Sequence, residues 1–210
     1  MKVVHLYIGG DPVSPRRINP LPSADFAIAA DSGAEIARST GAMVDVLVGD
    51  LDSISPRSLE FLTRSPTVIE AHPSRKDATD LELAWRVALG QNPEEIVIIG
   101  GGGGRLDHWL GNLGVITTPT AGDILITWVL EQETAYVVRG LRSVPTRPGT
   151  TFSLLPVGGD AHGVTVLEAE WPLSDHTLPA HSSLGISNLA SGEELNVEVK
   201  EGTLLVVQNH

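Results

Sequence analysis

Short apolar segments alternate with helix-like segments through the first two thirds of this 210-residue chain. The apolar segments, most of them followed closely by Gly, Asp or Pro, are residues 3–8, 26–30, 46–48, 68–71, 96–99 and 124–129. The helix-like segments between them are residues 34–40, 58–63, 81–89 and 106–116. This alternation predicts an α/β fold with a mainly parallel, Rossmann-like sheet that carries helices on both faces.

The pattern changes after about residue 139, where Pro145, Pro148 and Gly149 interrupt the chain. Short strand-like segments follow at residues 151–155, 164–167, 195–199 and 204–207, without a helix-length periodic segment. We therefore expect two domains, an α/β catalytic domain at residues 1–140 and a small antiparallel β-sandwich at residues 141–210.

Composition limits the partners of the chain. Its formal net charge of −12 argues against a nucleic-acid or anionic-membrane partner, because both require a basic surface. A nucleotide substrate stays open if Mg²⁺ screens its phosphates. The absence of Cys excludes disulfides, zinc thiolate sites and thiol catalysis. The apolar run before Gly9 is too short for a signal-peptide core, so we expect a cytoplasmic location.

The segment Gly49-Asp50-Leu51-Asp52-Ser53 directly follows the apolar run at residues 46–48. Side chains two residues apart in extended backbone project to the same side, so Asp50 and Asp52 can converge on one point. Gly49 would let the chain leave the strand sharply, beyond the carboxyl end where open α/β sheets bind ligands. The pair therefore predicts a Mg²⁺ site on a polyphosphate, since Mg²⁺ takes one or two carboxylates and keeps positions for phosphate oxygens. The alternative is an acidic turn that caps the helix beginning near Ser55.

Further motifs also lie at the carboxyl ends of predicted strands. Asp31, in Asp31-Ser32-Gly33-Ala34, is either a helix N-cap or an active-site acid. Lys76-Asp77-Ala78-Thr79-Asp80 precedes a helix with a capping-box start, where free N–H groups suit a phosphate; the alternative is a solvated helix start. The five glycines at 100–104 permit close backbone approach to a nucleotide, although neither a Walker A loop nor a convincing dinucleotide fingerprint is present.

Together these motifs resemble those of the thiamine pyrophosphokinase family, in family order and over nearly the whole chain. The residues that carry the resemblance are Asp31-Ser32-Gly33-Ala34, Gly49-Asp50-Leu51-Asp52-Ser53, Lys76-Asp77-Ala78-Thr79-Asp80, Gly103-Gly104-Arg105-Leu106-Asp107-His108 with Asn112, Trp171-Pro172-Leu173 and Gly185-Ile186-Ser187-Asn188. Ser32 stands where the family commonly has Gly, and the glycine run is longer than usual. These departures bear on loop geometry and kinetics rather than on the class of reaction.

The resemblance implies an ATP-dependent diphosphokinase, which transfers the diphosphoryl group of ATP to the hydroxyl of thiamine and releases AMP. By similarity, Asp50, Asp52 and Asp80 hold Mg²⁺ against the phosphates. Asp31 and Asp107 line the reaction centre, where they either orient the hydroxyl or ligate metal through water. The identity of a general base stays open, because two acids compete for that role and phosphoryl transfers can proceed with little base assistance.

The resemblance also assigns the substrate contacts. The candidate ATP-binding residues are Lys76, Asp77, Thr79, Gly103, Gly104 and Arg105. Trp171 is the candidate stacking platform for the cationic thiazolium, although a Trp in a small sandwich is more often core. Ser187 and Asn188 supply polar contacts to thiamine. A homodimer is implied, with each thiamine site shared between the catalytic domain of one subunit and the sandwich of the other.

Two alternative functions remain, and the second of them belongs to a different functional class. A related catalytic domain serves archaeal diphosphokinases that act on a hydroxymethylpterin, and the segment with Trp171, Ser187 and Asn188 favours thiamine over this substrate. A non-catalytic thiamine or nucleotide sensor is the second alternative. The full set of five aspartates argues against it, because a sensor does not need them all.

Overall fold

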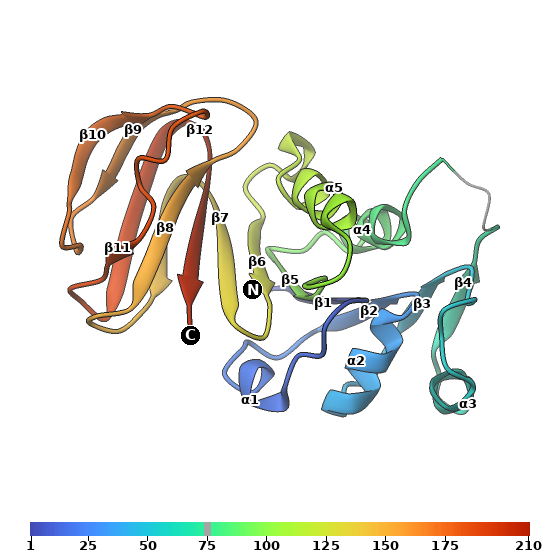
Figure 1. Ribbon diagram of the computed structural model, residues 1–210. Helices are drawn as coiled ribbons and strands as arrows, with labels where there is room; N and C mark the ends of the chain where they lie inside the picture. Colours follow the sequence, from blue (N-terminus) through green and yellow to red (C-terminus); the bar gives the residue numbers. More distant parts are fainter. Residues whose placement is uncertain (74–76) are drawn as a thin grey trace. The chain divides into compact units, whose positions relative to one another are not determined.

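The computed structural model describes residues 1–73 and 77–210 and divides into two compact units, Met1–Glu131 and Gln132–His210 (Figure 1). The sequence pattern places a domain boundary at residues 140 and 141. In the structure, these two residues lie inside strand β7 (Glu133–Pro145), so the whole of that strand belongs to the second unit.

The first unit alternates strands and helices along the chain. Its strands are β1 (Val3–Ile8), β2 (Phe26–Ala30), β3 (Val46–Gly49), β4 (Val68–Ala71), β5 (Glu95–Gly100) and β6 (Leu125–Val129). Its helices are α1 (Pro15–Ile18), α2 (Gly33–Thr40), α3 (Pro56–Thr63), α4 (Asp80–Gly90), α5 (Leu106–Ile116) and the short 3-10 helix η1 (Pro119–Ala121). The strands pair in the order β6-β5-β1-β2-β3-β4, and each of these pairs is parallel.

Helices cover both faces of this parallel sheet. Figure 1 shows α1, α2 and α3 on one face and α4 and α5 on the other. All residues of β1, β3 and β5 are buried, which explains why these strands are nearly continuous apolar runs in the sequence, with His5 and Glu95 as the exceptions. The edge strand β4 has all of its residues exposed. The predicted α/β class with a mainly parallel sheet is confirmed.

The second unit consists of antiparallel strands. They are β7, β8 (Thr151–Pro156), β9 (Ala161–Val166), β10 (Leu173–Leu178), β11 (Asn188–Leu189) and β12 (Glu194–Asn209). The long strand β12 pairs with β7 on one side, and with β9 and then β8 on the other. Phe152, Leu195 and Val206 lie fully buried in the core of this unit. The predicted antiparallel β-structure after the α/β part is confirmed.

Among the described residues, no helix has the length and apolar character needed to cross a membrane.

Candidate active site

The carboxyl ends of the parallel strands bring most of the predicted acidic residues to one edge of the sheet. Asp31 directly follows β2, and Asp50 directly follows β3. Carboxylate oxygens of Asp31, Asp50 and Asp52 all lie within 4.8 Å of one another. Asp80, the first residue of α4, has its Oδ1 only 3.2 Å from the point where a Cβ on Gly49 would lie. The structure thus gathers four of the five predicted catalytic aspartates, which we call the acidic cluster.

The acidic cluster lies on two turns, one at Asp31 and one at residues 50–53, and hydrogen bonds hold them together. Asp31 and Leu51 have φ values of 46° and 67°, in the left-handed region that non-glycine residues rarely adopt. The Asp31 N–H donates to the Val48 carbonyl at 2.8 Å, and the Ser53 hydroxyl donates to Asp31 Oδ2. Ser32, not Asp31, occupies the N-cap position of α2. Of the two alternatives for Asp31, the geometry therefore favours a place in the acidic cluster.

The carboxylates of the acidic cluster repel one another. The pKa of Asp52 is raised, chiefly by its hydrogen bond to Asp50 and the charge of that carboxylate, with smaller contributions from burial and from the charges of Asp31 and Asp80. Asp31 Oδ1 is buried and lacks a hydrogen-bond partner among the described residues. Hard oxygen donors are those that Mg²⁺ prefers, and a divalent cation would relieve the repulsion. The residues therefore fit a magnesium ion.

The strand order reverses at β1, which lies between β5 and β2, and such a reversal opens a ligand crevice at the carboxyl edge of a sheet. The loops that leave β1 and β5 there are residues 9–11 and the glycine run. The Asp11 N–H donates to the Gly102 carbonyl at 2.9 Å, and a Cβ on Gly103 would collide with the Asp11 carboxylate. The glycine run is therefore packed against the first loop. No recognised sequence motif pointed to Asp11.

Arg105 and Asp107 form an ion pair where the glycine run enters α5. Arg105 Nε donates to Asp107 Oδ1 at 3.1 Å, and Nη2 donates to Oδ2 at 2.6 Å. This forked contact lowers the pKa of the Asp107 carboxyl. Both side chains are largely exposed, at 72% and 63%, so the pair is accessible to a ligand.

The predicted phosphate motif lies at the start of α4. Thr79 is the N-cap, and its Oγ1 accepts a hydrogen bond from the Glu82 N–H at 3.2 Å, as the capping pattern predicts. Asp77 and Thr79 are both exposed. Lys76 lies outside the described residues.

In the second unit, the predicted thiamine-binding residues lie together. Trp171 is 54% exposed, in the bend before β10, and is not a core residue. The buried Asn188 side chain holds the Trp171 backbone: Oδ1 accepts from the Trp171 N–H at 3.1 Å, and Nδ2 donates to the Trp171 carbonyl at 2.8 Å. Ser187 is exposed and adopts a φ of 61°. The Asn188 amide thus fixes the segment that presents the indole.

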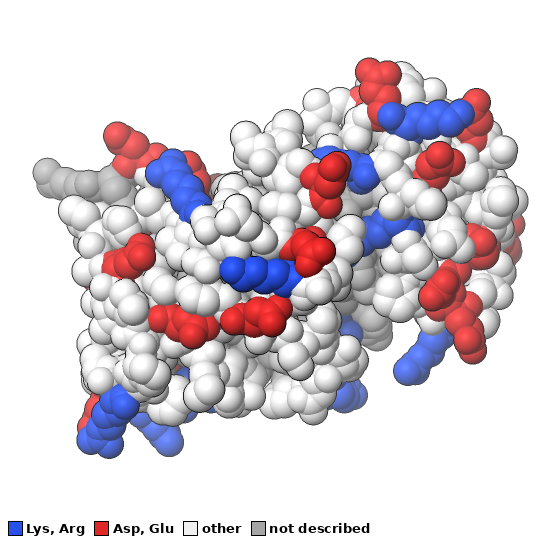
Figure 2. Space-filling model, turned by 180° about the vertical axis from the view of Figure 1, so that it is seen from behind, with Lys and Arg blue, Asp and Glu red and all other residues white. Residues whose placement is uncertain are grey.

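Charged side chains are mixed on the molecular surface. On the face shown in Figure 2, the described Lys and Arg side chains lie scattered among Asp and Glu. This face therefore presents no continuous basic surface of the kind that a polyanion requires.

Comparison with known sequences agrees with this division of the chain. The profile described as the catalytic domain of thiamin pyrophosphokinase matches residues 19–127, inside the first unit. The profile of the vitamin B1 binding domain of thiamin pyrophosphokinase matches residues 142–204, inside the second. The chain belongs to the thiamin pyrophosphokinase family. The resemblance predicted from the motifs is confirmed.

Curated relatives in this family are distant in sequence. The thiamine pyrophosphokinase of Bacillus subtilis (strain 168) is 25% identical over 216 residues, which cover 100% of this chain and 99% of that protein. Thiamine pyrophosphokinase 3 of Oryza sativa subsp. japonica is 26% identical over 174 residues, covering 77% of this chain and 64% of the plant protein.

Solved structures of the family share the fold. The crystal structure of the Bacillus subtilis thiamine pyrophosphokinase aligns with a TM-score of 0.87 at 24% identity, covering 99% of each chain. The thiamin pyrophosphokinase of Candida albicans aligns with a TM-score of 0.81 at 15% identity, over 100% of this chain and 89% of that chain.

Proposed function

We propose that this protein transfers the diphosphoryl group of ATP to the hydroxyl of thiamine, giving thiamine diphosphate and AMP. The observation that carries this proposal is the ordered match of both thiamin pyrophosphokinase profiles, each within one compact unit of the chain. These matches give no support to the hydroxymethylpterin alternative. The proposed chemistry also suits the acidic cluster, because diphosphoryl transfer mainly requires alignment and neutralisation of phosphate charge.

Mg²⁺ is the proposed metal, and Asp50, Asp52 and Asp80 are its proposed ligands. When bound, it would neutralise phosphate charge and hold the phosphates of ATP in place. Asp31 would orient the attacking hydroxyl, because its Oδ1 has no other hydrogen-bond partner among the described residues while Ser53 holds Oδ2. Asp107 would act at the same centre as a carboxylate kept ionised by Arg105.

The proposed ATP contacts come from two loops. They are Lys76, Asp77, Thr79, Gly103, Gly104 and Arg105. The switch point between β1 and β5 supports the glycine run in this role, because backbone without side chains can approach a nucleotide closely. Arg105 would exchange part of its contact with Asp107 for phosphate oxygens, which its planar fork can bind in pairs.

Trp171, Ser187 and Asn188 are the proposed thiamine-binding residues. The exposed indole of Trp171 offers a flat face for the cationic thiazolium, an attraction that strengthens when the ring is desolvated. The exposed Ser187 offers a hydroxyl for a hydrogen bond. Asn188 would serve the site by holding Trp171, since its amide is engaged with the Trp171 backbone on both sides.

We also propose a homodimer in which the second unit of one chain completes the thiamine site of the other. Exposed apolar side chains on both units support it, because patches of this kind often mark interfaces. Leu106 and Leu110 on α5 are 71% and 55% exposed, and Leu184 and Ile186 beside Ser187 are each 47% exposed. The cytoplasm remains the proposed location.

One assay tests the reaction. The protein is incubated with Mg²⁺ and ATP, together with either thiamine or hydroxymethylpterin, and the products are identified by chromatography and mass spectrometry. We expect AMP and thiamine diphosphate in equal amounts. Release of ADP, a product from the pterin alone, or binding of thiamine without turnover would each contradict the proposal.

A further inference from the structure

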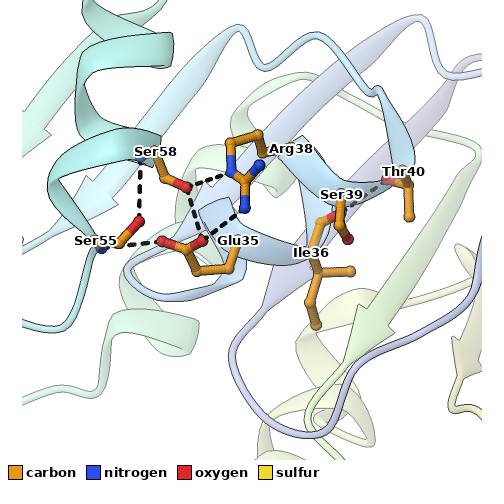
Figure 3. A network of polar contacts seen from close by, with 7 residues as sticks. All are labelled: Glu35, Ile36, Arg38, Ser39, Thr40, Ser55 and Ser58. Carbon is orange, nitrogen blue, oxygen red and sulfur yellow. Dashed lines mark hydrogen bonds and ion pairs between the residues drawn. The ribbon is translucent and has the colours of Figure 1, made fainter.

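A carboxylate outside the acidic cluster joins α2 to α3 (Figure 3). Glu35 Oε1 accepts a hydrogen bond from the Ser55 N–H at 2.9 Å, and Oε2 accepts from the Ser58 hydroxyl at 2.7 Å. Arg38 completes the network, with Nε 2.7 Å from the Ser58 hydroxyl and Nη2 3.4 Å from Glu35 Oε2. We call these four residues the Glu35 network. Three donors, one on α2, one on α3 and one on the N-cap residue of α3, thus converge on one side chain.

The Glu35 network binds the last residue of the segment that carries two of the proposed metal ligands, Asp50 and Asp52. Residues 50–55 contain no helix or strand, and they connect the end of β3 to the start of α3. Within this segment the Ser53 hydroxyl bonds to Asp31, Ile54 is buried in the core, and the Ser55 N–H bonds to Glu35. Through the Ser55 N–H, Glu35 therefore holds the C-terminal end of the segment at residues 50–55.

We propose that Glu35 is a positioning residue for the metal site, because it holds the exit of the turn that carries Asp50 and Asp52 against α2. The first residue of α2, Gly33, lies two residues after Asp31, so the same contact keeps the two turns of the acidic cluster side by side. This role rests on the metal site proposed above. It deepens that proposal by adding a residue that is not among the proposed metal ligands or substrate contacts.

The chemistry of the network requires a carboxylate. An ionised carboxylate only accepts hydrogen bonds, which suits the N–H of Ser55, the hydroxyl of Ser58 and the guanidinium of Arg38. Burial by itself raises the pKa of Glu35, but the hydrogen bonds from Ser55, Ser58 and Arg38 outweigh it and hold the pKa at about 2. A glutamine would keep the size of the side chain but turn an N–H₂ group toward donors. The Glu35→Gln variant should therefore keep only part of the network.

Binding of Mn²⁺ alone, measured from the loss of the free-ion electron paramagnetic resonance signal, tests this role without turnover. We expect Glu35→Ala to weaken Mn²⁺ binding by about 10-fold or more, as loss of an outer-shell partner of a metal site typically does. Glu35→Gln should weaken it less. The matched control is Glu60→Gln on α3, because Glu60 is an exposed carboxylate paired only with Arg64 on its own helix among the described residues. This control should bind Mn²⁺ as the wild type does.

Two further variants distinguish positioning by Glu35 from an effect of its charge alone and from a purely structural role. Ser58→Ala removes the hydroxyl that bonds to Glu35 Oε2 but keeps the charge and the Ser55 contact, so weaker Mn²⁺ binding by this variant supports positioning. Unchanged binding by Ser58→Ala beside equal weakening by Glu35→Gln and Glu35→Ala would mean that Glu35 acts only through its charge and would overturn the role. Asp50→Asn reports on the metal site itself. If Asp50→Asn loses Mn²⁺ binding while Glu35→Gln and Glu35→Ala stay within about twofold of wild type, Glu35 only joins two helices and our inference is wrong.

The remaining outcomes concern the metal site. If the wild type binds no Mn²⁺, or Asp50→Asn binds it equally well, the proposed metal site fails, and the role of Glu35 fails with it. Should Glu35→Ala not fold, Glu35→Gln and Ser58→Ala decide the question by the same comparison.

Discussion

The Asp52 carboxylate faces other carboxylates at close range, and this repulsion opposes folding. Its pKa is raised, chiefly by Asp50, so the folded state binds the proton of Asp52 more tightly than the unfolded chain does. The repulsion is therefore weak at low pH and lowers stability as the pH rises through the folded pKa. We expect Asp52→Asn, without divalent ions at neutral pH, to melt at the same temperature as the wild type or higher. The same variant should lose transfer by about 100-fold or more, because a direct metal ligand matters at least as much as an outer-shell partner.

Thermal unfolding in a chelator and turnover at saturating Mg²⁺ measure these two effects. Asp123→Asn is the control, since Asp123 is an exposed aspartate of the same unit after η1. Turnover by Asp52→Asn close to that of the wild type would show that Asp52 is not a metal ligand.

Replacing Arg105 by Lys shows whether the use of ATP depends on the planar shape of the guanidinium or only on its positive charge. Its guanidinium contacts both oxygens of Asp107 through two nitrogens, a geometry that an ammonium group cannot reproduce. We expect Arg105→Lys to reduce kcat/KM for ATP by about 10-fold, because a bidentate contact becomes a single one. Steady-state kinetics with ATP varied at saturating thiamine measure the effect. Unchanged kinetics would mean that Arg105 does not contact phosphate.

The sequence predicts where the aspartates of the site lie, but it does not predict the contacts made by Glu35 and Asn188. Asp31 and Asp50 directly follow the ends of neighbouring parallel strands and Asp52 lies two residues after Asp50, so their convergence could be predicted from the sequence. The contacts of Glu35 with Ser55, and of Asn188 with Trp171, join segments that are 20 and 17 residues apart. No local pattern encodes such a contact, because it exists only once two separate segments of the chain have packed together.

At the scale of elements, Gly33 lets α2 pack directly on the backbone of β1. A Cβ on Gly33 would collide with the Tyr7 carbonyl oxygen and lie 2.8 Å from Ile8 Cα. We expect Gly33→Ala to lower the free energy of unfolding by about 1 to 3 kcal/mol, the usual effect of overpacking. Urea unfolding measures this, with Gly90→Ala as the control, because a Cβ on Gly90 at the end of α4 meets nothing within 4 Å. Equal stability of Gly33→Ala and wild type would contradict the close packing of α2.

The contact between α2 and α3 should depend on pH. The folded pKa of Glu35, about 2, lies below its ordinary value of 4.5, because hydrogen bonds outweigh the opposing effect of burial. Its contribution to stability is therefore fully present above the ordinary pKa and is lost as the pH falls toward the folded pKa. We expect the stability difference between wild type and Glu35→Gln to be constant above about pH 5.5 and to shrink below it. Urea unfolding of both proteins at a series of pH values checks this, and a difference independent of pH would contradict it.

The sequence predicts buried strands more accurately than exposed ones. β1 and β2 begin and end where the sequence predicts, because nearly continuous apolar runs mark strands that are buried on both faces. β12 was predicted as two strands, since Lys200, Glu201 and Gly202 interrupt its apolar pattern, yet pairing continues across a register shift at that point. β10 was not predicted, because only its last residue is buried and no apolar run marks it.

At the scale of the whole molecule, the proposed metal ligands and the proposed thiamine-stacking residue belong to different units. The acidic cluster belongs to the first unit and the exposed Trp171 to the second. Trp171 is the proposed contact to thiamine, so Trp171→Ala should affect the use of thiamine more than that of ATP. We expect kcat/KM for thiamine to fall by about 5- to 150-fold, equivalent to about 1 to 3 kcal/mol for a stacked cationic ring.

A mixed dimer shows whether the two units that form one site come from different chains. One subunit carries Trp171→Ala and the other carries Asp50→Asn, and two affinity tags allow the heterodimer to be purified. If Trp171 serves the partner's acidic cluster, both lesions fall in one site, and the other site stays intact. The heterodimer should then retain roughly half of the wild-type rate, because stacking and metal binding are both complete at that second site. If Trp171 serves its own chain, each site carries one lesion, so at limiting thiamine a heterodimer with about a tenth of the wild-type rate or less would contradict the shared site.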